Sequence, residues 1–126
     1  MKLRLQGNSL RLRLSQKDVA RFHDTGRVDA VLAFPGGASL TWTLEATDAV
    51  QAATAIHANG EIRVRVPSAI ASAWAASNDV GIYSAAGAEP AIAIEKDFQC
   101  LHNDPSAPPR DDADAYPNPA ALPETA

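Results

Sequence analysis

The sequence predicts an α+β domain made of two related units, each of the order β-β-α-β-β. Residues 10–14 read Leu-Arg-Leu-Arg-Leu, the alternation of a half-buried strand, and residues 62–66 repeat it as Ile-Arg-Val-Arg-Val. Each run is followed by a short helical segment with one aromatic residue and then another strand. Two copies of one unit usually bury their apolar faces against each other about an approximate twofold axis. We therefore expect a mainly antiparallel sheet or a partly closed barrel, with two short helices covering one side.

The two units align without a gap, and their approximate bounds are 1–48 and 49–97. The alignment places three further pairs together: Phe22 with Trp74, Gly26 with Asn78, and Val28 with Val80. Only Arg11 with Arg63, Arg13 with Arg65, and Val28 with Val80 are identical in this stretch. What repeats is the pattern of apolar positions and helix ends rather than the residues themselves.

In the first unit, residues 2–5 alternate, Gly7 and Asn8 have turn chemistry, and residues 10–14 resume the alternation, which indicates a hairpin with one leucine face. Ser15 stands three residues before Asp18 and resembles a capping box that begins a helix. Gly26 is expected to end that helix. Strands are then expected at 28–32 and 40–44, joined by a turn at 35–37.

The second unit is expected to begin with a strand at 50–56, a turn at 59–60 and a strand at 61–66. Pro67 and Ser68 open a helix in which Ile70 and Trp74 share the buried face by their i,i+4 spacing. Asn78 is expected to leave the helix in the left-handed conformation. Strands then start at Val80 and again at 91–95.

A single globular domain is expected at 1–103, followed by an acidic tail at 104–126 that contains six of the nine prolines. Nine of the eleven basic residues lie at or before Arg65, and eight of the fifteen acids lie at or after Glu89. Within the tail, we expect Tyr116, Pro117 and Pro119 to anchor an extended strap on the domain or on a partner.

The sequence indicates a bacterial-type cytoplasmic protein. It shows no apolar leader and no run of the ~20 apolar residues that a membrane span requires. Its one cysteine, Cys100, excludes an intrachain disulfide and suits a reducing compartment.

Four segments together resemble a family of short bacterial proteins known as a domain of unknown function. They begin at Gly7, Trp74, Ile94 and Asp114, and read GNSLRLRL, WAASNDVGI, IEKDFQCL and DAYPNP. The resemblance runs nearly end to end and implies no activity, cofactor or catalytic residue. The chain also resembles the AbrB and MazE class of swapped-hairpin DNA-binding domains over about a quarter of its length. Residues 7–15 fit that class, whereas Asp29 replaces its Gly-Asp turn.

Basic side chains alternate with leucine and valine on the expected strands, which makes a polyanion-binding surface the main candidate site. Its residues are Lys2, Arg4, Arg11, Arg13, Arg63 and Arg65. Arginines also alternate in this way on any half-exposed sheet, where they face acids on neighbouring strands. The pI of 5.2 and the absence of aromatic residues between the arginines argue against a nucleic-acid partner.

Neither a metal site nor a catalytic site is indicated. The one cluster with metal-ligand types is Cys100 and His102, followed by Asp104, Asp111, Asp112 and Asp114. A single Cys-x-His lacks the four-ligand spacing of structural zinc, and carboxylates in a proline-rich tail are ordinarily hydrated. Glu45 and Glu95 hold similar positions on equivalent strands, and they would form an acid/base pair only if the fold brought them together. The phosphate-loop, dinucleotide and hydrolase motifs are missing, so no cofactor is expected. The aromatic residues Phe22, Trp42 and Trp74 are expected in the core.

These observations predict a non-catalytic protein-interaction or assembly module, with a protein partner or a homo-oligomer and no membrane. The alternative is a nucleic-acid-binding regulator or antitoxin that uses Arg11, Arg13, Arg63 and Arg65.

Overall fold

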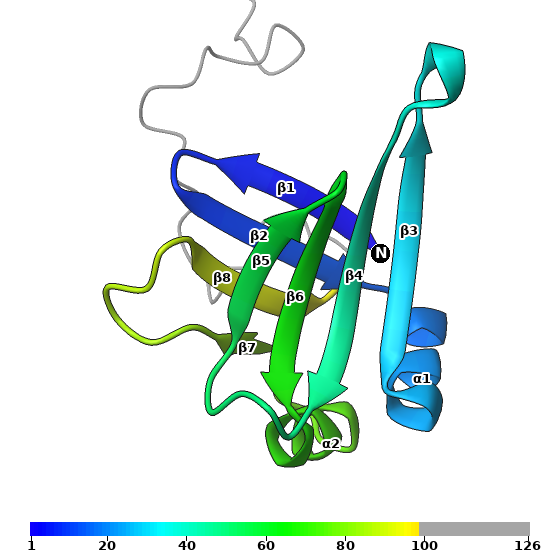
Figure 1. Ribbon diagram of the computed structural model, residues 1–126. Coiled ribbons are helices and arrows are strands. Elements are labelled where there is room, and N and C mark those ends of the chain that lie inside the picture. Colours follow the sequence, from blue (N-terminus) through cyan, green and yellow to red (C-terminus); the bar gives the residue numbers. More distant parts are fainter. Residues whose placement is uncertain (99–126) are drawn as a thin grey trace, which may run out of the picture.

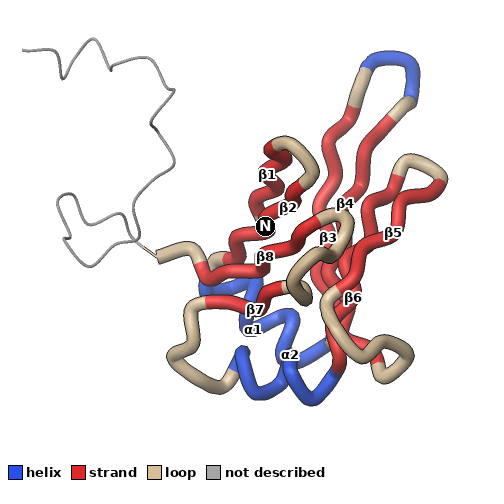
Figure 2. Tube along the Cα trace, turned by 90° about the vertical axis from the view of Figure 1, so that its left-hand side faces the viewer, coloured by secondary structure: helices blue, strands red, loops and turns tan. Residues whose placement is uncertain are grey.

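The computed structural model describes residues 1–98, which form two four-stranded mixed sheets and two helices (Figure 1). Sheet A has the order β1 (Lys2–Gln6), β2 (Ser9–Leu14), β8 (Ala91–Lys96), β7 (Gly81–Tyr83). Sheet B has the order β3 (Arg27–Ala33), β4 (Ser39–Thr47), β6 (Glu61–Pro67), β5 (Thr54–Ala58). The helices are α1 (Gln16–Thr25) and α2 (Ser68–Ala75), and a 3₁₀ turn, η1 (Pro35–Gly37), joins β3 to β4. Both helices lie at the same end of the sheets (Figure 2).

Each sheet consists of two antiparallel hairpins whose inner strands pair in parallel, β2 with β8 and β4 with β6. The expectation of one mainly antiparallel sheet or a partly closed barrel is therefore wrong: the sheets are separate, mixed and not closed. Alternation of apolar residues identifies a strand and its buried face, but it carries no information about a partner strand some eighty residues away.

The apolar faces of the two sheets enclose one core. Sheet A contributes Leu10, Leu12, Leu14, Ile82, Ile92 and Ile94, and sheet B contributes Val28, Leu44, Val64 and Val66. At the helical end, the rings of Phe22 and Trp74 meet edge to face with centroids 6.2 Å apart. Both are buried, as predicted. Trp42 is half-buried and donates a hydrogen bond from Nε1 to the Met1 carbonyl at 3.2 Å.

The predicted start and end of α1 are confirmed. The Ser15 hydroxyl accepts from the Asp18 backbone N–H, and the Asp18 carboxylate accepts from the Ser15 N–H, at 3.2 and 3.1 Å. Gly26 follows with φ 76°, and its N–H donates to the Phe22 carbonyl. Glycine fits here because a side chain is strained in this left-handed conformation.

The predictions for the second helix are partly wrong. Ala71, not Ile70, lies on the buried face with Trp74, and Ile70 is 45% exposed. The helix ends through Ala76 in the right-handed region, and Asn59 is the only non-glycine residue of 1–98 with positive φ, so Asn78 is not left-handed.

The gapless alignment also fails after the helices. Val28, which is buried and pairs with Leu44, lies six residues after Phe22. The corresponding buried residue on β7 is Ile82, which lies eight residues after Trp74. Val80 is half exposed because the segment between α2 and β7 is two residues longer. In the part of the chain that is described, no helix has both the length and the apolar character to cross a membrane.

Replacing Trp74 by alanine should lower the free energy of unfolding by about 3–5 kcal/mol, because a large buried ring leaves a cavity between the helices. Urea denaturation measures this loss. Ile70→Ala, on the exposed side of the same helix, is the matched control and should change stability little. Equal losses in the two variants would contradict the buried position of Trp74.

Candidate functional site

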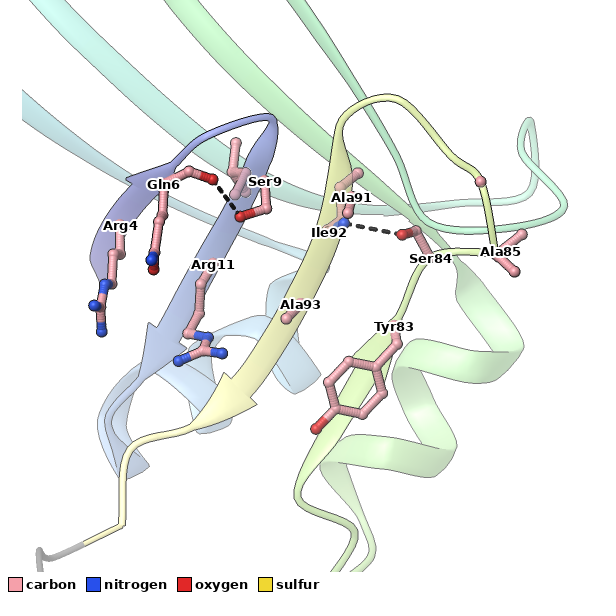
Figure 3. A pocket seen from close by; sticks show the side chains of 13 residues that line it. Arg4, Gln6, Ser9, Arg11, Tyr83, Ser84, Ala85, Ala91, Ile92 and Ala93 are labelled. Carbon is pink, nitrogen blue, oxygen red and sulfur yellow. Dashed lines mark hydrogen bonds between the residues drawn. The ribbon is translucent and has the colours of Figure 1, made fainter. Parts of the chain in front are cut away.

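A groove of about 410 Å³ crosses the outer face of sheet A (Figure 3). Its floor is formed by the small side chains of Ala91 and Ala93 on β8. One side is lined by Arg4 and Arg11 of the β1–β2 hairpin, and Tyr83 lies on the opposite side. Gln6, Ser9, Ser84 and the turn 85–87 complete the lining.

Strand register explains the shape of the groove. Arg4 is paired with Arg11, Arg11 with Ala93, and Ala93 with Tyr83, so these four residues form one row across the outer face. Because alanine stands between two long side chains on neighbouring strands, the surface is hollow along β8. The leucines of β2 and the isoleucines of β7 and β8 point into the core.

Glu95 connects the two sides at one end of the groove. Its carboxylate lies 3.2 Å from Arg11 Nε and accepts a hydrogen bond from the Tyr83 hydroxyl at 2.9 Å. Partial burial and the hydrogen bond to Glu95 raise the pKa of Tyr83, because both favour the protonated hydroxyl that donates to the carboxylate.

Gly81 makes this position of the Tyr83 ring possible. A Cβ atom at residue 81 would lie 2.7 Å from the Tyr83 hydroxyl oxygen and 2.9 Å from the Ile94 carbonyl oxygen, closer than van der Waals contact allows. Glycine is therefore required here for space rather than for a left-handed turn.

Four of the six predicted basic residues gather on this outer face: Lys2, Arg4, Arg11 and Arg13. Lys2 Nζ donates to Asp97 Oδ2 at 2.8 Å, and this hydrogen bond lowers the pKa of the Asp97 carboxyl. Among residues 1–98, no carboxylate lies within 4 Å of the Arg4 or Arg13 side chain.

The other two predicted basic residues, Arg63 and Arg65, lie on the outer face of sheet B. Arg63 is 2.9 Å from a Glu61 oxygen and 3.7 Å from Glu45. The other Glu61 oxygen accepts from the buried Thr43 hydroxyl at 2.9 Å, and Arg27 lies 4.0 Å away. The hydrogen bond from Thr43 is the largest cause that lowers the pKa of Glu61, followed by Arg63. A hollow of about 480 Å³ beside this network is lined by Thr41, Ile56, Ala58, Asn59, Glu61 and Arg63.

The remaining candidate residues do not form a reactive site. Glu45 and Glu95 lie on different sheets, each beside an arginine, so they are not an acid/base pair. His23 and His57 are exposed, and residues 1–98 contain no group of three potential metal ligands. Cys100, His102, Tyr116, Pro117 and Pro119 lie outside the described residues.

Sequence reasoning missed Tyr83 and the alanine floor of the groove. The run Ala91-Ile-Ala-Ile94 did carry a signal, because its small residues alternate with apolar ones and so occupy the outer face. It also missed the exposed apolar tip of the β3–β4 hairpin, where Val31, Leu32 and Phe34 are 62%, 49% and 50% exposed.

The fold and the site thus define an α+β domain with a basic groove on one sheet. The model of a family of unknown function, DUF7009, matches residues 1–120, and the chain belongs to that family. Neither the curated proteins nor the solved structures contain a match to the chain.

Replacing Thr43 by valine should raise the pKa of Glu61 towards its ordinary value, because the hydroxyl that stabilises the carboxylate is removed. A carboxyl whose pKa is lowered in the folded state stabilises the fold above its unfolded pKa, about 4.3. The stabilising free energy of the Glu61 carboxylate is lost as the pH falls through its lowered folded-state pKa. The valine variant should therefore lose less stability over this pH range.

Carbon-13 NMR titration of the Glu61 carboxyl measures the shift directly. Thr41→Val is the matched control, because Thr41 lies two residues earlier on the same face and its side chain makes no hydrogen bond within residues 1–98. A Glu61 titration that is the same in the Thr43 variant and the wild-type protein would contradict this interpretation.

Proposed function

We propose that this protein is a non-catalytic assembly module that associates with a second copy of itself through the β3–β4 hairpin. The observation that carries the proposal is a protruding hairpin whose residues 30–44 carry no charge and whose outer strand has an unprotected edge. The hairpin extends beyond the rest of the domain, with η1 at its tip (Figures 1 and 2).

The hairpin exposes an apolar surface. Residues 30–44 contain no charged side chain, and Val31, Leu32 and Phe34 are about half exposed or more. Leu32 is paired with Leu40, so the apolar row of the core face continues along the hairpin towards its tip. Leu32 lies on the core-facing side of the hairpin and Val31 on the other side, so both sides expose apolar residues, and exposed apolar surface of this kind often marks an interaction site.

The edges of the two sheets differ in their protection. In sheet A, β7 has only three residues, and β1 carries Lys2 and Arg4, which are common protections of an edge strand. In sheet B, β3 pairs with β4 over seven consecutive residues without a bulge or proline, and its half after Asp29 is apolar. The backbone N–H and C=O groups on the outer edge of β3 can therefore pair with a strand of another molecule.

A second copy is the partner that these features favour. Two β3 strands that pair antiparallel about a twofold axis present the same edge to each other, so one surface satisfies both copies. This pairing places the charged first part of each strand, Arg27 and Asp29, beside the uncharged second part of the other strand. It therefore brings no like charges into direct opposition.

We also propose that the chain consists of two related units that exchange hairpins to build the two sheets. The registers support this. Arg11 is paired with Ala93 and Arg13 with Glu95 in sheet A, while Arg63 is paired with Thr43 and Arg65 with Glu45 in sheet B. The two sheets also have equivalent strand orders. If β1, β2, β3 and β4 exchange numbers with β5, β6, β7 and β8, the order of one sheet becomes the order of the other.

A nucleic-acid-binding regulator is the alternative, and the cluster of Lys2, Arg4, Arg11 and Arg13 on one face favours it. Three of the six predicted basic residues, Lys2, Arg11 and Arg63, are ion-paired with carboxylates, and the six are divided between two sheets. We therefore rank this alternative second.

Random duplex DNA should not shift in a gel at low salt with micromolar protein, because the paired carboxylates would have to be displaced by phosphate. If a shift is observed, Arg4→Ala should weaken it and reduce its salt dependence. Arg63→Ala is the comparison on sheet B. A salt-dependent shift that Arg4→Ala weakens would reverse the ranking of the two functions.

Replacing Val31 by lysine should convert a dimer into a monomer, because the charge lies on the edge strand while the exposed side chain leaves the core intact. Light scattering over a range of concentrations should give a wild-type mass that approaches twice 13.2 kDa. The matched control is Ile70→Lys, at an exposed apolar position on α2, which should remain dimeric. A wild-type protein that stays monomeric at high concentration would rule out the proposal.

A further inference from the structure

The outer faces of the two sheets have hollows at corresponding positions of the strand register. Ser9, Arg11 and Ala93 line the groove on sheet A, and Glu61, Arg63 and Thr43 hold the same register positions on sheet B. In both sheets the arginine contacts a glutamate of the parallel neighbour, Glu95 or Glu45.

The two faces differ in their carboxylates, because sheet B has Glu61 and Asp29 at the register positions that Ser9 and Tyr83 hold on sheet A. On sheet B, Glu61 accepts from Arg63 and from Thr43, and it is the second anionic partner of the arginine. On sheet A, the corresponding position is Ser9, whose hydroxyl donates to the Gln6 carbonyl. Arg4 on β1 stands where sheet B has Ile56 on β5, so the position next to the arginine holds a base in sheet A and an apolar residue in sheet B.

We infer that the groove on sheet A binds carboxylates of the chain's own C-terminal segment, residues 111–116, which supply the acid that Glu61 supplies on sheet B. The inference depends on the groove and on charge, and it is independent of the hairpin proposed for self-association.

Charge complementarity favours this occupant. Residues 1–98 contain ten basic and ten acidic residues and have no net charge, whereas residues 99–126 contain five acids and one arginine. The formal net charge of −4 therefore belongs to the segment after Phe98. Asp111, Asp112 and Asp114 are its densest group of acids, and the family match extends past them to residue 120.

The length of chain after Phe98 also fits. The chain leaves sheet A at the end of β8, and the groove extends back along that strand as far as Ala91, five residues and roughly 17 Å away at 3.3 Å per residue. Residues 99–110 reach up to about 40 Å when extended, which is enough to return. Because the segment is tethered, its effective concentration at the groove is in the millimolar range, so weak ion pairs are sufficient.

The segment also carries an aromatic residue at a suitable spacing. Side chains two residues apart share one face of an extended chain, so Asp112, Asp114 and Tyr116 face the same way when the segment binds in that form. The carboxylates then meet Arg4 and Arg11, and the ring of Tyr116 covers the alanine floor beside Tyr83.

Amide NMR spectra of the full-length protein test the inference. Replacing Asp111, Asp112 and Asp114 together by asparagine should shift the resonances of Arg11, Ala93 and Tyr83, because the groove loses its carboxylates. The resonances of Thr41 and Arg63, in the corresponding hollow of sheet B, should stay in place. This second set also reports that the variant is folded.

The reciprocal experiment changes the groove. Arg4→Gln should shift the amide resonances of residues 111–114, and Arg21→Gln, at an exposed position of α1, should not. A triple variant that leaves the groove resonances unchanged, or that shifts both hollows equally, would overturn the inference. So would an Arg4 variant that leaves residues 111–114 unaffected.

A mixing experiment separates binding within one chain from binding between copies. Isotope-labelled protein is mixed with unlabelled protein that carries Cys100→Ser and a nitroxide on Ala120→Cys. Broadened groove signals of the labelled protein would show that the segment comes from another molecule, contrary to the inference. Signals that keep their width, together with the shifts described above, support binding within one chain.

Discussion

The structure depends on two parallel strand pairs, β2 with β8 and β4 with β6, because they are the contacts that assemble each sheet from hairpins of different halves of the chain. A two-stranded hairpin is marginally stable alone, and each one here would expose its apolar face. Parallel pairing makes each sheet four-stranded and allows the leucine and isoleucine face of sheet A to cover the valine and leucine face of sheet B. The same pairing sets β8 between β2 and β7, so the groove exists only when distant parts of the chain have met.

The features that the sequence predicted are those determined by neighbouring residues. The β1–β2 hairpin follows from the turn at Gly7, and α1 follows from the Ser15–Asp18 capping box and from Gly26. The outward position of Arg11 and Arg13 follows from strict alternation with buried leucines.

Features that depend on three-dimensional context were not predictable in this way. Ile70 and Ala71 are both apolar helix residues, and only the path of the following segment decides that Ala71 faces the core. The two extra residues between α2 and β7 move the buried position from Val80 to Ile82, because a gapless pattern cannot represent an insertion. The groove was missed for a similar reason: its walls come from β1, β2 and β7, and no local pattern places Tyr83 opposite Arg4.

The position of β8 has a consequence for the protein during its synthesis. Sheet B is complete once Pro67 has left the ribosome, whereas sheet A lacks its central strand until Lys96 has also left it. At ordinary elongation rates, this interval is on the order of seconds, far longer than a hairpin needs to form. Throughout it, the β1–β2 hairpin has no β8 beside it, so the nascent chain exposes a leucine face and an unpaired strand edge, the combination that makes folding intermediates prone to aggregate.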